Sequence, residues 1–502
     1  MRHILLGLAL FCAAPPLAAQ DDSPFFETAL DAPHAIIDQP YFQRLYSGDR
    51  KTLVLLGKDE ERHFFFSLYQ RLEGEPQNLP IPGNALFFDF LSTGEKERAF
   101  ITYVTKSGIS RVNLETGKTQ EIASLKSVYR LDQNPNLSHL DFAKDLNGDG
   151  RDDILLQDFE GYHLLIQNED GFDAPLFLPF PVEMRVGGQP FYDQEAPRYH
   201  SFPVYNLDMT LDGRNDIAFL KDRIIHVFPQ VEGGQFSTTG QTIDLPMDIV
   251  GNSMKEFLEA EEASSNRANF TENRIFKIQD MDGDKRPDIL TLQEKAEGTF
   301  DRKATYAIHF GRDSEGRLSF NADADTDLTI EGFSLFQDVE DVNGDGQFES
   351  ITASNEIGIG KIVSALLTGS TKFDLNIHEL DTDKRFNANP SLKKKLRLDF
   401  EFSSGSVSVP AVKLADLNGD GLKELILDDE KEGLLIFTQS GEGGLVFSRS
   451  SVEYKVNLPK DGQLVQVEDI DDNGREDLII HFDAFGADGE DKRNHIVFLL
   501  AL

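Results

Sequence analysis

Oxygen-bearing side chains recur along this chain at a spacing that suits a hard metal ion. Six nine-residue segments, called the acidic loops below, carry such side chains at their first, third, fifth and ninth positions, and they span residues 145–153, 208–216, 280–288, 341–349, 416–424 and 469–477. A calcium ion takes about six to eight oxygens, and alternate residues of a tight loop can direct their side chains to one point. We therefore predict up to six calcium sites.

The expected ligands follow the loop positions, and the first loop also offers the backbone carbonyl of Arg151. The expected side chains are Asp145, Asn147, Asp149 and Asp153; Asp208, Thr210, Asp212 and Asp216; Asp280, Asp282, Asp284 and Asp288; Asp341, Asn343, Asp345 and Glu349; Asp416, Asn418, Asp420 and Glu424; and Asp469, Asp471, Asn473 and Asp477. Ordinary turns are the alternative, since Asp, Asn and Gly dominate turns. Six copies in one register favour metal binding. Because the copies are so alike, most ions are expected to stabilise the fold by neutralising carboxylates that repel one another.

The acidic loops differ from an EF-hand at their ends. An EF-hand has a Glu at its twelfth position and a helix after it. Here the twelfth residues lie in short apolar runs, and they are Leu156, Phe219, Thr291, Thr352, Leu427 and Ile480. Each loop is therefore expected to join two strands. We expect the weakest calcium binding in one of two loops, because the third has Lys285 where the others have glycine and the second has Thr210 at its third position.

The strings that begin at these aspartates, such as DLNGDGRDDILL and DLNGDGLKELIL, resemble the FG-GAP/VCBS-type repeats of secreted bacterial proteins, which are related to the propeller of integrin α-subunits. The resemblance covers roughly residues 35–502. It implies that each repeat forms one four-stranded blade of a β-propeller and that the acidic loop links the first two strands of its blade. The Phe-Gly…Gly-Ala-Pro signature of integrins survives only in fragments, so the likeness is to the bacterial subgroup.

The spacing of the acidic loops indicates the number of blades. The loops start 53 to 75 residues apart, which fits a four-stranded blade of about 40–50 residues plus connections. Two degenerate copies lie upstream, around Tyr46 and Asp89. Strands of alternating or apolar residues, such as HFFFSLYQ and NHIVFLLAL, fill the intervals. We predict an all-β fold, a β-propeller of seven or eight blades, closed by a strand near His34–Ile37.

The N-terminal residues have the pattern of a secretory signal peptide over residues 1–19, with a basic start, a short apolar stretch and small residues before the expected cleavage near Ala19. We expect an N-terminal extension over 20–34 and the propeller over 35–502. The one cysteine, Cys12, lies in the signal, so no disulfide holds the mature chain together. The expected location is secreted or periplasmic, and no segment is long enough to span a membrane.

The strong acidity limits the possible partners. The chain has 49 Lys and Arg against 87 Asp and Glu, a net charge of −38. Nucleic acid requires a basic surface, so it is not an expected partner, and anionic membranes are disfavoured for the same reason. Six calcium ions would leave a charge of about −26, so the acidity exceeds what the metal sites need. The chain has no Trp but 39 Phe, and the Phe side chains are expected in the core.

No catalytic signature stands out in the sequence. There is no G-x-S-x-G elbow, no phosphate-binding glycine loop and no H-E-x-x-H pair. The densest polar and aromatic stretch, residues 185–200, is expected to be a long connection, and its candidate ligand-binding residues are Tyr192, Arg198, Tyr199 and His200. Near a calcium ion, these residue types can neutralise a uronate and abstract a proton. The alternative is a surface segment of mixed polarity.

The leading hypothesis is a secreted or periplasmic calcium-binding β-propeller that acts as a non-catalytic binding or adhesion module with a protein or glycan partner. Two alternatives stay open at this point. One is a calcium-dependent polysaccharide lyase, since some lyase families use similar eight-bladed calcium propellers, and the other is a structural envelope protein. The sequence does not name the ligand.

Overall fold

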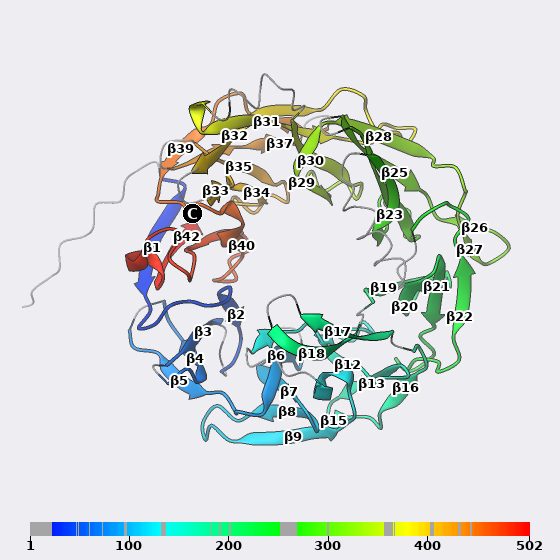
Figure 1. The fold of residues 1–502 in the computed structure, drawn as a ribbon, viewed down its shortest axis with the longest axis vertical. Coiled ribbons are helices and arrows are strands. Elements are labelled where there is room, and N and C mark those ends of the chain that lie inside the picture. Colours follow the sequence, from blue (N-terminus) through cyan, green and yellow to red (C-terminus); the bar gives the residue numbers. More distant parts are fainter. Residues whose placement is uncertain are drawn as a thin grey trace, which may run out of the picture.

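The computed structural model describes residues 23–502 apart from 47, 49, 60, 73, 95–97, 132–136, 182, 190–191, 200–201, 251–268, 299–300, 356–364, 366, 402–405, 430–432 and 442–443. The expected signal peptide, 1–19, lies outside the described residues. The described chain forms eight sheets arranged around a central axis, and Figure 1 shows the ring from one face. The fold is therefore an eight-bladed β-propeller, the larger of the two predicted sizes.

Blades 1 to 4 come from the first half of the chain. Blade 1 consists, from the axis outward, of β2 (Tyr41–Gln43), β3 (Thr52–Lys58), β4 (Phe64–Tyr69) and β5 (Gln77–Pro80). Blade 2 consists of β6 (Ala85–Ser92), β7 (Ala99–Thr105), β8 (Gly108–Val112) and β9 (Thr119–Ser124), with β10 (Ser138–His139) parallel to β6. Blade 3 consists of β11 (Ala143–Lys144), β12 (Asp153–Gln157), β13 (Tyr162–Leu165) and β16 (Leu176–Leu178). Blade 4 consists of β19 (Val204–Leu207), β20 (Asp216–Lys221), β21 (Ile224–Phe228) and β22 (Gln241–Asp244).

Blades 5 to 8 follow the same order. Blade 5 consists of β23 (Asn269–Gln279), β24 (Asp288–Glu297), β25 (Arg302–His309) and β28 (Thr326–Glu331). Blade 6 consists of β29 (Phe333–Glu340), β30 (Glu349–Asn355), β31 (Ser370–His378), β32 (Leu392–Glu401) and β33 (Ser406–Ser408). Blade 7 consists of β34 (Val412–Ala415), β35 (Glu424–Asp428), β36 (Gly433–Phe437) and β39 (Val452–Lys455). Blade 8 consists of β40 (Val465–Glu468), β41 (Asp477–His481), β42 (His495–Ala501) and β1 (Phe25–Asp31).

Shorter elements decorate the blades. The 3-10 turns are η1 (Val128–Leu131), η2 (Gly462–Leu464) and η3 (Glu490–Lys492). Four two-stranded hairpins lie outside the blade sheets, and they pair β14 (Gln167–Asn168) with β15 (Gly171–Phe172), β17 (Met184–Gln189) with β18 (Tyr192–Tyr199), β26 (Arg312–Asp313) with β27 (Leu318–Ser319) and β37 (Gln439–Ser440) with β38 (Val446–Phe447). The ring itself is therefore built almost wholly from antiparallel strand pairs.

Ring closure differs from the prediction in its position. The strand that completes blade 8 is β1, which pairs antiparallel with β42 from Phe25 opposite Ala501 to Asp31 opposite His495. This strand lies inside residues 20–34, which we expected to be an extension, so the propeller begins at Phe25 and not at residue 35. Residues His34–Ile37 are not a strand; they only continue the link from β1 to blade 1. Closure leaves no open sheet edge between the first and last blades.

Apolar side chains fill the space between neighbouring blades. Blades 3 and 4, for example, share a cluster in which the rings of Phe180 and Phe219 stack with centroids 4.8 Å apart. Most described Phe side chains are buried or half-buried, and the clear exceptions are Phe26 and Phe485. The excess of Phe therefore serves the core, as expected.

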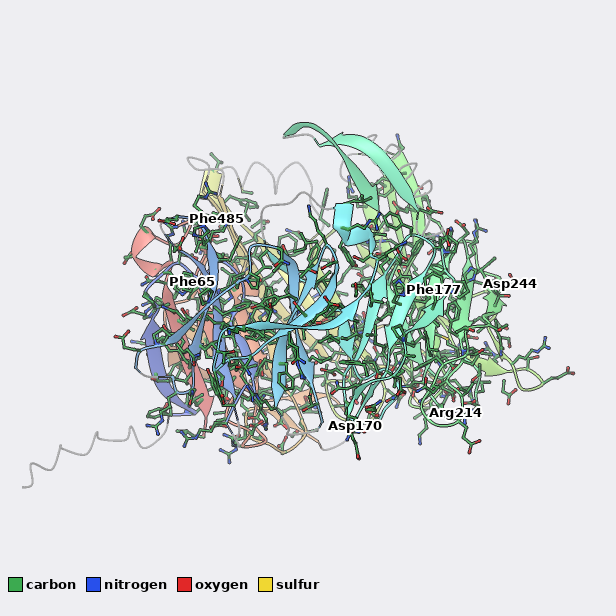
Figure 2. The ribbon with its side chains drawn as sticks, turned by 90° about the horizontal axis from the view of Figure 1, so that it is seen from below. Phe65, Asp170, Phe177, Arg214, Asp244 and Phe485 are labelled. Atoms are coloured by element: carbon green, nitrogen blue, oxygen red, sulfur yellow. The ribbon has the colours of Figure 1, made fainter. Side chains whose placement is uncertain are left out.

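Two segments differ from the sequence predictions. Residues 185–200 are not an irregular connection, because most of them form the β17–β18 hairpin, which projects from one face of the ring (Figure 2). Asp89 is not in a degenerate acidic loop. It lies within β6, and its carboxylate accepts the N–H groups of Phe142 and Ala143, both at 2.8 Å. Asp89 therefore ties blade 2 to the first strand of blade 3.

Candidate metal centres

Each acidic loop joins the innermost strand of a blade to the next strand, in blades 3 to 8. Because the strands alternate in direction, all six loops lie at the same face of the ring. In Figure 2, Arg214 of the second loop lies at the lower face, and the β17–β18 hairpin, which belongs to the connection from blade 3 to blade 4, lies at the upper one. The acidic loops and the hairpin therefore occupy opposite faces.

The first residue of every acidic loop folds the loop around its own carboxylate. Asp145 accepts the N–H groups of Gly148 and Gly150, both at 2.8 Å. The bond to the sixth residue recurs in all six loops, with acceptors Asp145, Asp208, Asp280, Asp341, Asp416 and Asp469. These bonds hold the turn in shape without help from other parts of the chain, so the position of the first carboxylate is fixed in advance.

The fifth residue of each loop is fixed in the same way. Its side-chain oxygen accepts the N–H of the seventh residue in all six loops, with acceptors Asp149, Asp212, Asp284, Asp345, Asp420 and Asn473. The third residue accepts the N–H of the fifth in five loops, with acceptors Asn147, Asp282, Asn343, Asn418 and Asp471. Thr210 makes no such bond among those the structure describes. The second loop is thus the least regular, in line with its weaker set of oxygens.

The sixth residue needs a left-handed backbone, as the glycines there suggested. Its φ is +85° at Gly150 and +83° to +86° in the four other glycine loops. Lys285 occupies the same position in the third loop with φ +68°. A side chain in this conformation costs about 1–2 kcal/mol. The third loop therefore keeps the fold of the others at an energetic cost.

The ninth residue of each loop is a buried acid. These side chains begin the second strand of each blade and are at most 1% exposed: Asp153, Asp216, Asp288, Glu349, Glu424 and Asp477. The carboxylate of Asp288 shows the usual pattern, since it accepts the N–H groups of Met281 and Gly311, both at 2.8 Å. Each acid therefore lies beneath its loop and accepts at least one backbone N–H of the loop itself.

Burial raises the pKa of all six ninth residues. Removal from water is the largest cause, and the other carboxylates of the same loop add to it, while the backbone N–H bonds act in the opposite direction. The pKa rises to about 6 for Asp216 and Asp477, to about 7 for Asp153, Asp288 and Glu424, and to about 8 for Glu349. A cation beside these groups would offset the cost of ionising them away from water and would lower their pKa values.

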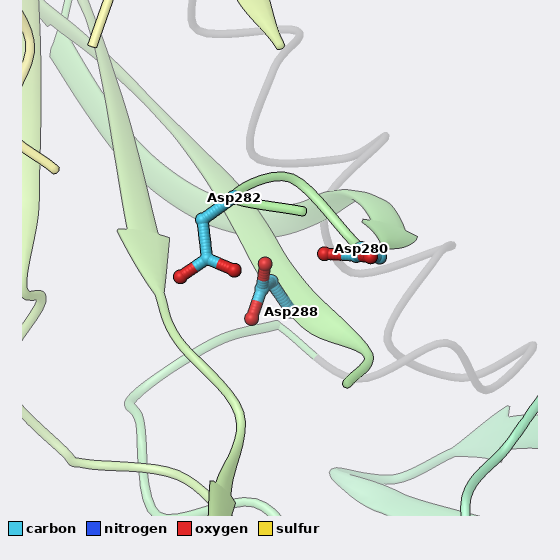
Figure 3. Close-up of side chains that lie close together, drawn as sticks. All are labelled: Asp280, Asp282 and Asp288. Atoms are coloured by element: carbon cyan, nitrogen blue, oxygen red, sulfur yellow. The ribbon is translucent and has the colours of Figure 1, made fainter. Parts of the chain in front are cut away.

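Two loops bring three carboxylates together. One oxygen each from Asp280, Asp282 and Asp288 lies within 4.8 Å of the others, as Figure 3 shows, and the same holds for Asp469, Asp471 and Asp477. In the remaining loops an Asn or Thr stands at the third position. Hard oxygen donors alone, with buried acids among them, are the ligand set that calcium prefers. The donor sets of these loops therefore fit the ion that we expected.

The fifth residue departs from this grouping. Asp284 is not among the three clustered carboxylates of its loop, and its second oxygen pairs with the guanidinium of Arg286. Asp212 pairs in the same way with Arg214. In these two loops the fifth carboxylate can reach an ion only if the arginine releases it.

Successive acidic loops are bonded to one another across the blade boundaries. In three of the loops the eighth residue donates its N–H to a carbonyl in the loop of the preceding blade: Phe348 to Met281 at 3.0 Å, Lys423 to Val342 at 3.2 Å and Glu476 to Asp416 at 2.8 Å. The carboxylate of Glu476 also accepts the N–H of Asp416 at 2.7 Å. The sequence prediction missed this role of the eighth position. That residue precedes the ninth-position ligand, and no other feature of the sequence marks it.

Blade 1 has no acidic loop, and basic residues take its place. Arg44 forms an ion pair with Asp472 at 2.5 Å, and Lys51 contacts Glu468 at 3.0 Å and the carbonyl of Asp469 at 2.6 Å. All three acceptors belong to blade 8. The degenerate turn around Tyr46 therefore supplies positive charge to the acidic loop that precedes it in the ring.

The second predicted group of residues lies on the hairpin. Tyr192, Arg198 and Tyr199 belong to β18, while His200 lies outside the described residues. The structure describes the backbone of this hairpin, so the ligand-binding role of these residues stays a prediction.

A groove between blades 4 and 5 was not predicted. It has a volume of about 690 Å³, within the range of ligand sites. Uncharged polar residues line it on neighbouring strands of blade 5, where Asn273 lies opposite Gln293, and Gln293 opposite Thr305. The buried Oδ1 of Asn273 has no hydrogen-bond partner within the described structure. The groove thus combines uncharged hydrogen-bonding groups with acidic side chains, since Asp248, Glu272 and Asp323 also line it.

No family model matches this chain, and no curated protein matches it. Among solved structures, an Agrocybe aegerita lectin that recognises non-reducing terminal N-acetylglucosamine is 14% identical, with a TM-score of 0.37, and the match covers 84% of this chain and 99% of the lectin. The V. cholerae biofilm matrix protein Bap1 is 11% identical, with a TM-score of 0.25 over 92% of this chain and 77% of Bap1. The WD40 domain of SCAP from fission yeast is 10% identical, with a TM-score of 0.26 over 82% of this chain and 96% of that domain. Likeness this distant says nothing of ligands or sites.

No helix in the described part of the chain is long and apolar enough to cross a membrane.

Proposed function

We propose that this protein is a secreted or periplasmic β-propeller of the FG-GAP/VCBS type, in which calcium ions in the acidic loops stabilise a non-catalytic binding module. The observation that carries the calcium assignment is the buried acid at the ninth position of all six loops. An ionised carboxylate without water or a cation is costly, and a calcium ion supplies the missing charge with oxygen coordination that the loops already approximate.

The ligand of the module, in this proposal, is a neutral glycan bound in the groove between blades 4 and 5. Amide and hydroxyl groups of the kind provided by Asn273, Gln293 and Thr305 pair well with sugar hydroxyls. The unpartnered Oδ1 of Asn273 needs a donor. The one arginine of the groove, Arg223, is already paired with Asp248 at 3.0 Å. Among the described residues that line the groove, no unpaired Lys or Arg faces a uronate, and Glu272 and Asp323 would repel one, which favours a neutral sugar over an acidic one.

The calcium part of the proposal is tested by thermal melts of the mature protein with calcium and with a chelator. Calcium that binds only the folded state raises the free energy of unfolding by about 2.7 kcal/mol for each site at a free calcium concentration of a hundred times its Kd. The melting temperature therefore rises. Equal melting temperatures in both conditions would mean that the acidic loops are plain turns.

The glycan part is tested separately by binding to immobilised neutral and uronate-containing polysaccharides in saturating calcium. We expect retention on a neutral glycan and its loss in Asn273→Ala and Gln293→Ala. The matched control is Gln241→Ala, which removes an exposed amide from the outer strand of blade 4. Binding that survives both groove variants would move the ligand site elsewhere, and retention by a protein partner alone would refute the glycan assignment.

A further inference from the structure

The third acidic loop differs from the others in that a side-chain cation already lies against it. The ammonium of Lys384 contacts the carboxylate of Asp282, whose side chain is 2% exposed. Lys384 belongs to blade 6, in the connection between β31 and β32, whereas Asp282 belongs to blade 5. The contact therefore crosses the boundary between two blades and ends at one of the three clustered carboxylates of the loop.

The turn that carries Lys384 is firmly placed. Asp381 donates its N–H to the carbonyl of Arg385 at 2.8 Å, and Phe386 donates its N–H to the hydroxyl of Thr326 in blade 5 at 2.9 Å. The side chains of Leu380 and Phe386 are buried in the apolar cluster of blade 5. The ammonium is thus held at the loop by packing and by backbone bonds, not by its own flexible side chain alone.

Blade 4 contains the same turn with a glycine in the place of the lysine. Residues 230–236 and 380–386 share an isolated bridge between their ends, and each has the matching backbone bond, from Val231 to Gln235 and from Asp381 to Arg385. The fifth residue of the blade 4 turn is Gly234, with φ +73°. Its carbonyl accepts a bond from the Asn147 amide at 3.4 Å, and Asn147 is the third residue of the preceding acidic loop.

Lys384 therefore stands where glycine is the natural residue. Its φ is +59°, a conformation that disfavours side chains other than glycine. Both turns place their fifth residue against the third residue of the preceding blade's acidic loop, Asn147 in one case and Asp282 in the other. A neutral asparagine faces the glycine, and a carboxylate faces the lysine. The unfavourable backbone of Lys384 thus coincides with a carboxylate at the contacted position, which the blade 4 turn lacks.

The charged groups around the third loop fit this pairing. Lys285 lies in the loop itself, Arg286 is occupied by Asp284, and Lys277 on β23 donates to the carbonyl of Val339 at 2.8 Å. Within the described structure, Lys384 is the one among these cations that contacts a clustered carboxylate. We propose that the Lys384 ammonium is a built-in counter-ion of the third acidic loop, which competes with calcium and leaves this loop without an ion at concentrations that fill the others.

Only the competition with calcium rests on the proposed function; the counter-ion role of Lys384 does not. Without calcium, the ammonium of Lys384 stabilises the buried carboxylates whether or not any loop binds metal. With calcium, the ammonium opposes the ion, because a like charge this close changes the affinity by on the order of tenfold or more. The two effects have opposite signs in one variant, which makes them separable.

The experiment compares the wild-type protein with Lys384→Gln and Lys384→Gly by melting in a chelator and by calcium counting after equilibrium dialysis. Lys384→Gly gives the blade 6 turn the residue type that the blade 4 turn has at the same position. If Lys384 has no electrostatic role, relief of its backbone strain should raise the melting temperature of this variant in chelator. If Lys384 is a counter-ion, both variants should melt at a lower temperature than the wild type. The matched control is Lys372→Gln, an exposed lysine on β31 of the same blade, which is expected to change neither measurement.

With calcium, we expect the wild-type chain to bind one ion fewer than Lys384→Gln at intermediate free calcium. Equal ion counts and affinities in the two proteins would overturn the competition. A melting temperature in chelator that is unchanged or raised in both variants would overturn the counter-ion itself. If no variant binds calcium at all, the proposed function fails, while the melts in chelator still decide whether Lys384 neutralises the loop.

Discussion

The stabilisation by calcium should grow as the pH rises. The buried carboxyl groups at the ninth position of the six acidic loops hold protons at low pH, and once ionised they can bind calcium instead. In the folded chain without metal, the ninth residues of the acidic loops have pKa values raised to between about 6 and about 8. In the unfolded chain these groups return to their ordinary values near 4. Between these limits the folded protein without calcium holds protons that the unfolded chain has released.

The size of the effect follows from the pKa shifts. For Asp288, a pKa raised from 3.8 to about 7 corresponds to about 4 kcal/mol of cost for the ionised form in the folded state. Six such groups ionised together without a cation would cost on the order of 20 kcal/mol, more than the roughly 5–15 kcal/mol by which folded domains are stable. Below the raised pKa, protons occupy these sites. Above it, a cation offsets the cost of the ionised carboxylates.

The sign follows from proton counting. Because the folded metal-free state binds more protons than the unfolded state from about pH 4 to about pH 8, its free energy of unfolding falls as the pH rises through this window. With calcium bound, the same carboxylates are already ionised and this loss is absent. Protons compete with the ion at low pH, so calcium affinity weakens there.

Buried histidines act in the opposite direction, and the assay must separate them. Burial lowers the pKa of five of them, so they destabilise the fold as the pH drops below about 6.5; they are His34, His226, His309, His378 and His481. Their contribution is the same with and without calcium. The quantity to measure is therefore the calcium-induced shift in melting temperature, at intervals from pH 5 to pH 8.

We expect this shift to be small at pH 5 and to increase steeply up to pH 8. The variant Asp153→Asn, in the first acidic loop, keeps the shape of a buried side chain whose pKa is raised to about 7 but removes its charge. It should melt higher than the wild type in chelator at pH 8 and gain less from calcium. The control Asp244→Asn changes an exposed carboxyl on β22 and should alter neither value. A calcium shift that is constant across the pH range, or largest at pH 5, would refute the reasoning.

Three further predictions concern the ring. Deletion of residues 23–31, which removes β1, should expose the edge of β42 and produce oligomers in size-exclusion chromatography, because a free strand edge pairs with other chains; a monodisperse monomer would contradict this. Arg44→Ala should lower the free energy of unfolding by about 1–3 kcal/mol, and a double-mutant cycle with Asp472→Asn should show that the two effects are not additive. Gly462→Ala should destabilise the fold by about 1–3 kcal/mol in chemical denaturation, since its Cβ would lie 2.3 Å from the Ala411 nitrogen; an unchanged midpoint would contradict the close packing.

The repeat and its loops were predictable because both are local. The first, third, fifth and ninth residues of each loop lie within one turn of chain, and their bonds are made to backbone in the same turn or the adjoining strand. The glycine position was predictable too, since positive φ is a property of the residue itself. Sequence patterns succeed where the partner of a residue is a few positions away.

The closing strand was not predictable in the same way. The segment FFETALD has no regular alternation of buried and exposed residues, and its partner β42 lies more than 460 residues away. Nothing near Phe25 specifies that pairing, so the boundary of the propeller was placed ten residues too late. The prediction of a degenerate acidic loop around Asp89 failed for a related reason. An aspartate before an apolar run resembles a loop start, while its real partners, the N–H groups of Phe142 and Ala143, belong to the next blade.

The position of Lys384 could have been found by a finer comparison. The segments QVEGGQF (230–236) and LDTDKRF (380–386) have their last Phe in common and a glycine or lysine two residues before it. Aligned as parts of two blades, they show a lysine at a glycine position. The contact with Asp282, however, depends on how blade 6 is seated against blade 5, which no single-blade pattern contains.

The acidic loops also connect the blades, so the charge of each joint affects its neighbours. The eighth residue of one loop bonds to the preceding loop, as Glu476 does to Asp416, and an ion that orders one loop therefore orders the seam beside it. Basic side chains contact acidic residues at two of the seams: Arg44 at the seam of blades 8 and 1, and Lys384 at that of blades 5 and 6. In a chain with no cysteine after Cys12, positive charge between acidic blades takes the role that covalent links have elsewhere. Loss of a cation at any joint should consequently loosen two blades, not one.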